Sequence, residues 1–327
     1  MPRVNLEKNM KHMNNKLTFL YLPLLFGLIL STPAYSKDKI TLLLDWFINP
    51  DHAPIIIAQQ KGFFSDEGLN VSIIAPADPN DPPKLVAAGK AELAISYQPQ
   101  LHVQVSQGLP LIRIGTLVST PLNSLVVMKQ GPIRNISDLK GKKIGYSVGG
   151  FEDALLSEML SSYNLTLKDV ELINVNFSLS PALISGKVDA VIGAFRNFEL
   201  NQMDILNKPG KAFYPEEHGV PVYDELIIVA NSKNLNNKSF PKFIRSIESA
   251  VQYLINHPDE SWKLFIKGNK ELDNELNRRA WRDTLPRLTL RPAPYDRNRY
   301  IRFAKFLKSK GLIKKVLPVE KYAIELR

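Results

Sequence analysis

Short apolar runs recur along the first two thirds of the chain, and most are followed by a segment with the spacing of a helix. The runs have the length of buried strands. Several of the helix-like segments end at a glycine, as helices often do. Short strands that alternate with helices predict an α/β fold with largely parallel sheets. The expected strands are 39–44, 69–74, 91–96, 111–118, 124–128, 143–148, 170–175, 191–193 and 224–230.

The last third of the chain has a different pattern, in which apolar residues recur with helical spacing. Basic residues are frequent there and contribute to a net charge of +10 for the chain. A basic surface can bind nucleic acid or anionic lipid. Here the basic residues are spaced among apolar ones such as Trp281 and Phe303, so we interpret them as solvated faces of amphipathic helices, with no nucleic-acid partner. The expected helices of the chain are 53–61, 84–88, 103–107, 151–163, 240–256, 258–265, 274–285 and 296–310.

One internal similarity indicates two lobes of the same construction. Residues 85–95 and 182–192 both read as a short helix, a Gly-Lys pair, an acidic residue and a buried strand. Chance similarity of two such segments is the alternative. We expect one lobe to comprise 37–128 and 230–327, and a second lobe, inserted into it, to comprise 129–229. A cleft between two lobes is a natural ligand site.

The N-terminal segment has the three regions of an export signal. Four basic residues precede the apolar run 17–30, and Ala34 and Ser36 form an A-x-S cleavage site. The run is short for a membrane span. We therefore predict a signal peptide over 1–36, cleaved near Ser36, and a periplasmic protein that is a monomer. An uncleaved membrane anchor is the alternative, and Met10 or Met13 is an alternative start.

The sequence offers no catalytic motif. The chain contains no cysteine, which excludes disulfides, cysteine-based metal sites, cysteine catalysis and a lipoprotein anchor. It has no Gly-x-Ser-x-Gly, phosphate-binding loop or His-Glu-x-x-His motif, and its histidines His52 and His102 lie far apart without flanking metal ligands. We therefore expect no catalytic residues, no metal and no cofactor.

Polar and aromatic residues directly follow the first predicted strand. Trp46, Asn49 and His52 lie between its carboxyl end and the next helix, where ligands bind in open α/β sheets. The alternative is that Asp51 only caps the helix and that Trp46 belongs to the core. Gly149-Gly150 opens a later helix, where amide groups can hold an anion or a polar ligand atom; a structural tight turn explains it equally well.

Aromatic residues recur at other predicted strand ends, beside polar ones. Flat rings can stack on a flat ligand, while a carboxylate accepts hydrogen bonds from its ring nitrogen or amino group. This combination would hold a pyrimidine. The residues of this kind include Tyr97, Tyr146, Phe151, Phe177, Phe195, Phe198, Asn197 and Glu199.

Several segments resemble the thiamine-pyrimidine family. They include Leu44-Asp45-Trp46, Lys61-Gly62-Phe63-Phe64, 139–146 and 189–193, and the similarity covers 39–230 well and the helical tail weakly. The family includes periplasmic binding proteins of ABC importers that take up formylaminopyrimidine precursors of thiamine. It also includes the yeast-type enzyme that builds the thiamine pyrimidine from pyridoxal phosphate and its own histidine. The resemblance implies a two-lobed periplasmic binding protein of type II, with a ligand cleft between the lobes.

Differences between this sequence and the yeast-type enzyme decide between the enzyme and the binding proteins of the family. The enzyme has a lysine for pyridoxal phosphate shortly before the consumed histidine; His102 matches that histidine, but 96–100 contains no lysine. The enzyme's cysteine-rich motif is absent, and an export signal is unusual for an enzyme that needs cytosolic pyridoxal phosphate. We therefore expect the solute-binding component of an ABC importer, which is not an enzyme and delivers a formylaminopyrimidine-type precursor to an inner-membrane permease. The pyrimidine synthase is the alternative, as is a binding protein for another solute, such as a flavin or a sulfonate.

The expected ligand site combines both lobes. Trp46 is expected to stack on the ring and Glu199 to accept from its nitrogen or amino group, with Glu152 or Asp224 as the next acids to consider. Because an open cleft is wet, removing the charge of Glu199 should change the stability of the ligand-free protein little. The predicted ligand-binding residues are Trp46, Asn49, His52, Tyr97, His102, Tyr146, Gly149, Phe151, Phe195, Asn197 and Glu199.

Overall fold

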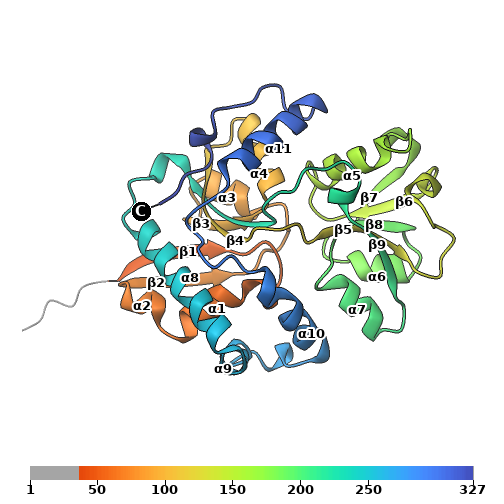
Figure 1. The fold of residues 1–327 in the computed structure, drawn as a ribbon. Coiled ribbons are helices and arrows are strands. Elements are labelled where there is room, and N and C mark those ends of the chain that lie inside the picture. The colour runs from red at the N-terminus through yellow and green to blue at the C-terminus, as the bar shows by residue number, and fades with distance from the viewer. Residues whose placement is uncertain (1–36, 327) are drawn as a thin grey trace, which may run out of the picture. The chain divides into compact units, whose positions relative to one another are not determined.

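Two five-stranded sheets organise the protein in the computed structural model (Figure 1). The structure describes residues 37–326, so the predicted signal peptide and its cleavage near Ser36 lie outside the described residues. The first sheet has the order β2-β1-β3-β10-β4 and the second the order β7-β6-β8-β5-β9. The first sheet contains β1 (Asp38–Leu43), β2 (Leu69–Ile74), β3 (Leu93–Ser96), β4 (Leu111–Val118) and β10 (Leu226–Asn231). The second contains β5 (Asn123–Met128), β6 (Lys143–Tyr146), β7 (Glu171–Asn174), β8 (Ala190–Phe195) and β9 (Gly210–Phe213).

Both sheets have the same pattern of strand directions. In the first, β1 pairs in parallel with β2 and β3, whereas β10 is antiparallel to β3 and β4. In the second, β6 pairs in parallel with β7 and β8, whereas β5 is antiparallel to β8 and β9. The α/β prediction is therefore confirmed, with one antiparallel strand in each sheet. The matching orders support two lobes of the same construction.

The internal similarity in the sequence corresponds to equivalent elements of the two sheets. Helix α3 (Pro82–Ala87) leads into β3, and helix α6 (Leu179–Ile184) leads into β8. The glycines between them, Gly89 and Gly186, have φ values of +70° and +73°. Only glycine adopts this left-handed conformation without strain, so it ends each helix and turns the chain back to the middle strand.

Helices cover both faces of each sheet (Figure 1). On the first sheet, α1 (Ala53–Gln60) and α8 (Ser239–Asn256) pack on one face, and α3, α4 (Gln98–Ser106) and α11 (Arg297–Ser309) lie on the other. Strand β1 shows why: Ile40 and Leu42 belong to one apolar core and Leu43 to the other, because successive side chains point to opposite faces. The other α-helices are α2 (Phe63–Asp66), α5 (Glu152–Ser161), α7 (Glu199–Ile205), α9 (Pro258–Phe265) and α10 (Glu275–Thr284).

The chain crosses between the sheets earlier than the sequence indicated. We expected crossings near Met128 and Val229, but β5 already pairs with β8 and β9, and β10 pairs with β3 and β4. The crossings are therefore 119–122 and 214–225. We propose lobe limits at these segments: a first lobe of 38–118 and 226–326, and a second lobe of 123–213.

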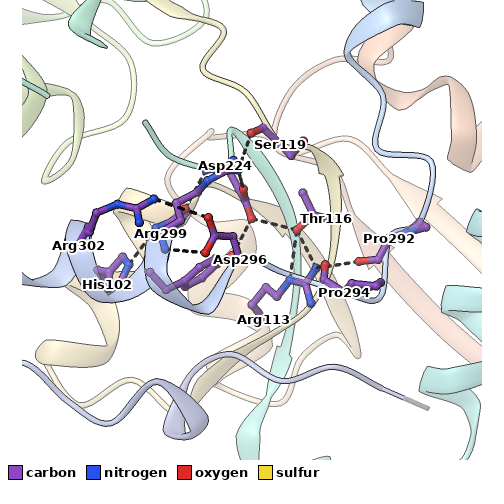
Figure 2. A network of polar contacts seen from close by, with 12 residues as sticks. His102, Arg113, Thr116, Ser119, Asp224, Pro292, Pro294, Asp296, Arg299 and Arg302 are labelled. Carbon is purple, nitrogen blue, oxygen red and sulfur yellow. Dashed lines mark hydrogen bonds and ion pairs between the residues drawn. The ribbon is translucent and has the colours of Figure 1, made fainter. Parts of the chain in front are cut away.

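Two charged side chains hold the crossings together. Glu225, on the second crossing, accepts from the backbone amides of Leu122 (2.6 Å) and Asn123 (2.9 Å) on the first. Arg299 of α11 donates to the carbonyl of Ser119 (2.6 Å) and pairs with Asp224, so it binds both crossings where they leave the first lobe (Figure 2). We call these contacts the hinge clamp.

The C-terminal segment covers the edge strand β4. Arg113 of β4 is fully buried, and its guanidinium donates to the carbonyls of Pro292, Ala293, Pro294 and Ile324 and to Thr116 Oγ1 (Figure 2). A buried charge without such acceptors would be costly. Arg113 therefore joins the tail to the first sheet.

The basic residues of the last third are mostly exposed on helices, as expected. Several form exposed ion pairs, such as Arg279 with Glu275 (2.7 Å) and Arg297 with Glu320 (2.7 Å). Among residues 37–326, no helix combines the length and the hydrophobicity needed to cross a membrane.

Candidate ligand-binding cavity

A cavity with about 430 Å³ of empty space is lined by residues of both lobes. Sites for small molecules occur preferentially at the interfaces between domains. The first lobe contributes Asp45, Trp46, Asn49, Asp51, His52 and Tyr97; the second contributes Glu152, Leu179, Gly193, Phe195, Phe198 and Glu199.

The ends of three strands position these residues. Asp45 to His52 follow β1, Tyr97 follows β3, and Phe195 ends β8. Strands β1 and β3 are parallel neighbours, so their carboxyl ends meet at one edge of the first sheet. The site therefore lies where α/β sheets bind ligands, as predicted for 45–52.

Asp45 fixes two of the lining side chains. Its Oδ1 lies 2.9 Å from His52 Nε2, and its Oδ2 accepts from the Tyr97 hydroxyl at 2.8 Å. His52 Nδ1 accepts from the Asn49 amide at 3.3 Å, so the network assigns the ring hydrogen to Nε2. Burial, with the charge of Asp45, raises the pKa of Tyr97 well above its usual value, so this phenol remains a donor.

Aromatic rings from both lobes meet around the cavity. Tyr97 stacks on Phe151, with ring centroids 5.0 Å apart, and meets Phe195 edge-on at 6.4 Å. Trp46 packs edge-on against Phe177 at 4.6 Å. These contacts connect residues after β1 and β3 to residues of the second lobe. The cavity thus has flat apolar walls suited to a flat ligand.

Two buried glutamates add acidity to these walls. Glu152 accepts from the Ser147 amide at 2.8 Å, and Glu199 accepts from the Phe195 amide at 2.6 Å. Burial raises the pKa of each to about 8. Gly193 makes room for one of them, because a Cβ there would lie 2.4 Å from Glu152 Oε1. None of the described lining residues is Lys or Arg, so the cavity suits a ligand with N–H donors or positive charge.

Six predicted residues line the cavity, namely Trp46, Asn49, His52, Tyr97, Phe195 and Glu199. Two others lie directly behind its wall. Phe151 is buried against Tyr97, and Asn197 donates to Asp51 Oδ1 at 2.7 Å. Their contribution to ligand binding stays a prediction, but their placement agrees with it.

Three predicted residues lie elsewhere. His102 lies a helical turn inside α4, where its Nε2 contacts the Gln98 side chain (3.2 Å) and its ring packs among Tyr300, Phe303 and Tyr322. Tyr146 packs against the core of the second lobe. Gly149 is exposed and donates its amide to Asn80 Oδ1 (3.0 Å), a contact between the lobes. The structure gives no support to these three as ligand contacts.

Sequence reasoning missed several lining residues. Asp45 and Asp51 lie within the stretch that the sequence singled out, but the sequence pattern suggests Asp51 only as a helix cap. The sequence suggested Glu152 only as an alternative to Glu199 as the acceptor for the ligand. The other alternative, Asp224, belongs to the hinge clamp. Phe198 was among the recurring aromatic residues but not among the predicted ligand-binding residues, and Leu179 and Gly193 carried no signal, because only the folded second lobe brings them to the cavity.

The chain is similar to proteins connected with the thiamine pyrimidine. A model of the family described as "NMT1/THI5 like" matches residues 49–261. A Haemophilus influenzae protein whose name places it, provisionally, in thiamine biosynthesis is 54% identical over 307 residues, 94% of this chain and 98% of that protein. The formylaminopyrimidine-binding protein of Halalkalibacterium halodurans is 29% identical and covers 80% of this chain and 81% of its own length. The 4-amino-5-hydroxymethyl-2-methylpyrimidine phosphate synthase of Uromyces fabae is 31% identical and covers 74% of each chain.

Solved structures confirm the predicted two-lobed fold of type II periplasmic binding proteins. The alkanesulfonate-binding protein SsuA from Xanthomonas axonopodis pv. citri has a TM-score of 0.69 at 13% identity, covering 88% of this chain and 98% of that one. The periplasmic aliphatic sulphonate binding protein SsuA from Escherichia coli has a TM-score of 0.66 at 14% identity, covering 89% and 93%. At these identities the likeness shows the fold alone.

Proposed function

Because the chain belongs to the NMT1/THI5-like family, we propose that it binds an aminopyrimidine precursor of thiamine, of the formylaminopyrimidine type, and delivers it to an ABC permease. The name of the Halalkalibacterium halodurans relative supports the ligand class. The fold, shared with binding proteins of import systems, supports the role in transport.

The chemistry of the cavity carries this proposal. Trp46 and Phe195 offer aromatic surfaces, while Glu152 and Glu199 offer buried carboxyl groups. An aminopyrimidine is flat, carries an amino group and gains a proton on its ring, so it matches both features. A sulfonate is an anion, and the described lining offers it four carboxyl groups and no basic side chain to pair with.

The enzyme reading has less support in this cavity. The synthase relatives are enzymes, but His102, which matches their consumed histidine, lies outside the lining, and among residues 37–326 the lining contains no lysine that could bind pyridoxal phosphate. We therefore expect incubation with pyridoxal phosphate and iron to leave His102 intact. Intact-mass analysis checks this, and loss of a histidine-sized fragment would favour the synthase.

We also propose export to the periplasm with loss of residues 1–36. The support is the three-part leader in the sequence and the periplasmic location in the name of a structural neighbour. N-terminal sequencing of the protein from a periplasmic extract should begin at Lys37. A mature protein that still carries 17–30 would contradict cleavage.

Ligand binding itself can be measured directly. We expect mass spectrometry of the purified protein to find an aminopyrimidine, and calorimetry to show binding of formylaminopyrimidine. Trp46→Ala removes a stacking surface, and Glu199→Gln removes a carboxyl group that can ionise when the ligand brings N–H donors or positive charge, so each should weaken binding about tenfold or more.

Glu217→Gln is the matched control for Glu199→Gln, because Glu217 lies in the crossing next to the same lobe but is largely solvated. It should bind like the unmodified protein. If circular dichroism shows that the Trp46 and Glu199 variants are folded, and both bind formylaminopyrimidine as tightly as the unmodified protein, the assignment of this cavity as the ligand site is wrong. If the unmodified protein binds no aminopyrimidine, the proposed ligand is wrong.

A further inference from the structure

Asp51 connects three segments of the chain behind the cavity. Its Oδ1 accepts from Asn197 Nδ2 at 2.7 Å and from the Thr284 hydroxyl at 2.9 Å. Asn197 also donates to Thr284 Oγ1 at 2.8 Å, so the three side chains form a closed ring of hydrogen bonds. All three are buried, with Asp51 only 2% exposed. We call this ring the interlobe knot.

The interlobe knot exists only while the two lobes are together. Asp51 follows β1 and Thr284 ends α10, both in the first lobe, whereas Asn197 follows β8 in the second. Opening the lobes would separate Asn197 from its two partners. A hydrogen bond to a carboxylate is about twice as strong as a neutral one. The knot therefore favours the closed arrangement.

The second carboxylate oxygen of Asp51, Oδ2, disfavours the closed arrangement of the ligand-free protein. Asp51 lines the cavity, and its Oδ2 is buried without a hydrogen-bond partner among the described residues. Burial is the largest cause that raises the pKa of Asp51, and the charge of Asp45 adds to it. Leaving a buried acceptor unpaired costs free energy. Closing the two lobes without a ligand therefore costs free energy. A hydrogen-bond donor in the cavity that reaches Oδ2 would remove this cost.

We infer that Asp51 couples ligand binding to lobe closure: Oδ1 holds Asn197 of the second lobe, and Oδ2 accepts an N–H from the ligand. This inference rests on the proposed function for the class of ligand, an amino or protonated ring nitrogen. A ligand stabilises one conformation only by binding it better than the other. Here the difference is that Oδ2 loses water on closure and regains a donor only when the ligand is present.

Two variants separate the roles of the two oxygens. Asp51→Asn keeps an oxygen for the interlobe knot but replaces Oδ2 with an amide that cannot accept, so formylaminopyrimidine should bind about tenfold or more weakly. Asn197→Ala keeps Oδ2 but breaks the knot, so it should raise the dissociation rate by about tenfold while changing the association rate little. The double variant should lose less than the two single losses combined, because the residues act as a unit.

Asn201→Ala is the matched control. Asn201 lies on α7, near Asn197, and also binds across the lobes, to Asp283 at 2.7 Å, but this contact is exposed. The affinity of the Asn201→Ala variant for formylaminopyrimidine should change less than about twofold. An equal loss in Asn201→Ala and Asn197→Ala would mean that any interlobe hydrogen bond has this effect, and would overturn the inference.

Small-angle scattering of the ligand-free protein tests the coupling without reference to the ligand. Asp51→Asn should be more compact than the unmodified protein, because a neutral amide is less costly to bury than a carboxylate. Asn197→Ala should be less compact. Unchanged scattering in both variants would overturn the inference. Failure of the unmodified protein to bind the pyrimidine would instead contradict the proposed function, while the scattering result would still decide the role of Asp51.

Discussion

At the scale of single residues, the carboxyl groups of the cavity are the main departure from expectation. We expected a wet cleft in which removing the charge of Glu199 changes stability little, but Glu199 is only 8% exposed and Glu152 only 3%. Burial raises the pKa of both to about 8. Near neutral pH each therefore holds a proton in the ligand-free protein. A ligand that brings N–H donors or positive charge favours the ionised form instead.

The raised pKa values predict how stability depends on pH. A glutamate in the unfolded chain loses its proton near its ordinary pKa of 4.5, whereas these two keep theirs until about 8. Between these values the folded state binds more protons, so the ligand-free protein should lose stability as pH rises. Carboxyl groups with lowered pKa values act below this window, whereas His102, whose pKa burial lowers from 6.5 to about 3, opposes the trend up to about pH 6.5. The glutamine of Glu199→Gln stays neutral at every pH, so the free energy of unfolding of this variant should fall less steeply with pH. At about pH 8 the variant should be more stable than the unmodified protein by roughly 1 kcal/mol or more.

Urea denaturation at about pH 5, 6.5 and 8 checks this prediction, with Glu217→Gln as the solvated control. The expectation that Glu199→Gln leaves stability unchanged would hold only if Glu199 were solvated. If the free energy of unfolding depends on pH with the same slope in the Glu199 and Glu217 variants, that expectation is restored and the raised pKa of Glu199 is contradicted.

At the scale of elements, the sequence predicted the alternation of strands and helices because apolar periodicity reports burial. It missed the first turn of α4, since Gln98-Pro99-Gln100 looks polar. In the fold, Gln98 accepts from the Asp224 amide (2.8 Å) and Gln100 from the Ser96 hydroxyl (2.8 Å), which allows their burial. It also missed β9, a short, partly buried strand that pairs only with β5 among the described strands.

The candidate site was predictable to the same extent. The stretch 45–52 could be found because it follows a recognisable strand. The approach of Glu152 to Gly193 could not, because it depends on how α5 packs against β8. Long-range contacts of this kind leave no local pattern in the sequence.

Strand β8 therefore offers a test of this packing. Gly193 has φ +103°, and an added Cβ would clash with the Glu152 carboxyl group. Gly193→Ala should lower the free energy of unfolding by about 2–4 kcal/mol and abolish most ligand binding. Gly186→Ala is the matched control: its φ is +73° but nothing lies within 4 Å of a Cβ, so it should cost only about 1–2 kcal/mol.

Denaturant titration of both variants measures these costs. Shortening the opposing side chain should recover part of the loss, so Gly193→Ala with Glu152→Ala should be more stable than Gly193→Ala alone. Equal costs for Gly193→Ala and Gly186→Ala would show that Glu152 does not lie against β8.

At the scale of the whole molecule, the hinge clamp defines where the lobes pivot. Glu225 ties the crossings to each other, and Arg299 ties both to α11. Hinges absorb their backbone changes in a few residues. We therefore expect the change on closure to be confined to 119–122 and to the part of 214–225 that precedes Asp224.

Removing Glu225 should loosen this region. Glu225→Ala leaves the amides of Leu122 and Asn123 without their acceptor, so their hydrogen exchange should accelerate by roughly tenfold to a hundredfold. Exchange measured by nuclear magnetic resonance checks this, with the solvated Glu217→Ala as control. Exchange at Leu122 and Asn123 that is unchanged relative to the control would show that Glu225 does not hold the crossings.

The covering of β4 by the tail has a consequence for a chain that is still being made. The strands of the second sheet all lie within 123–213, so that lobe can form as soon as this segment has been synthesised. The first lobe cannot, because Arg113 finds its backbone acceptors only at 292–294 and 324. Until those residues arrive, burying Arg113 would leave a charge unpaired. The first lobe is thus the last of the two to become stable, because its final fold waits until residue 324 has been synthesised.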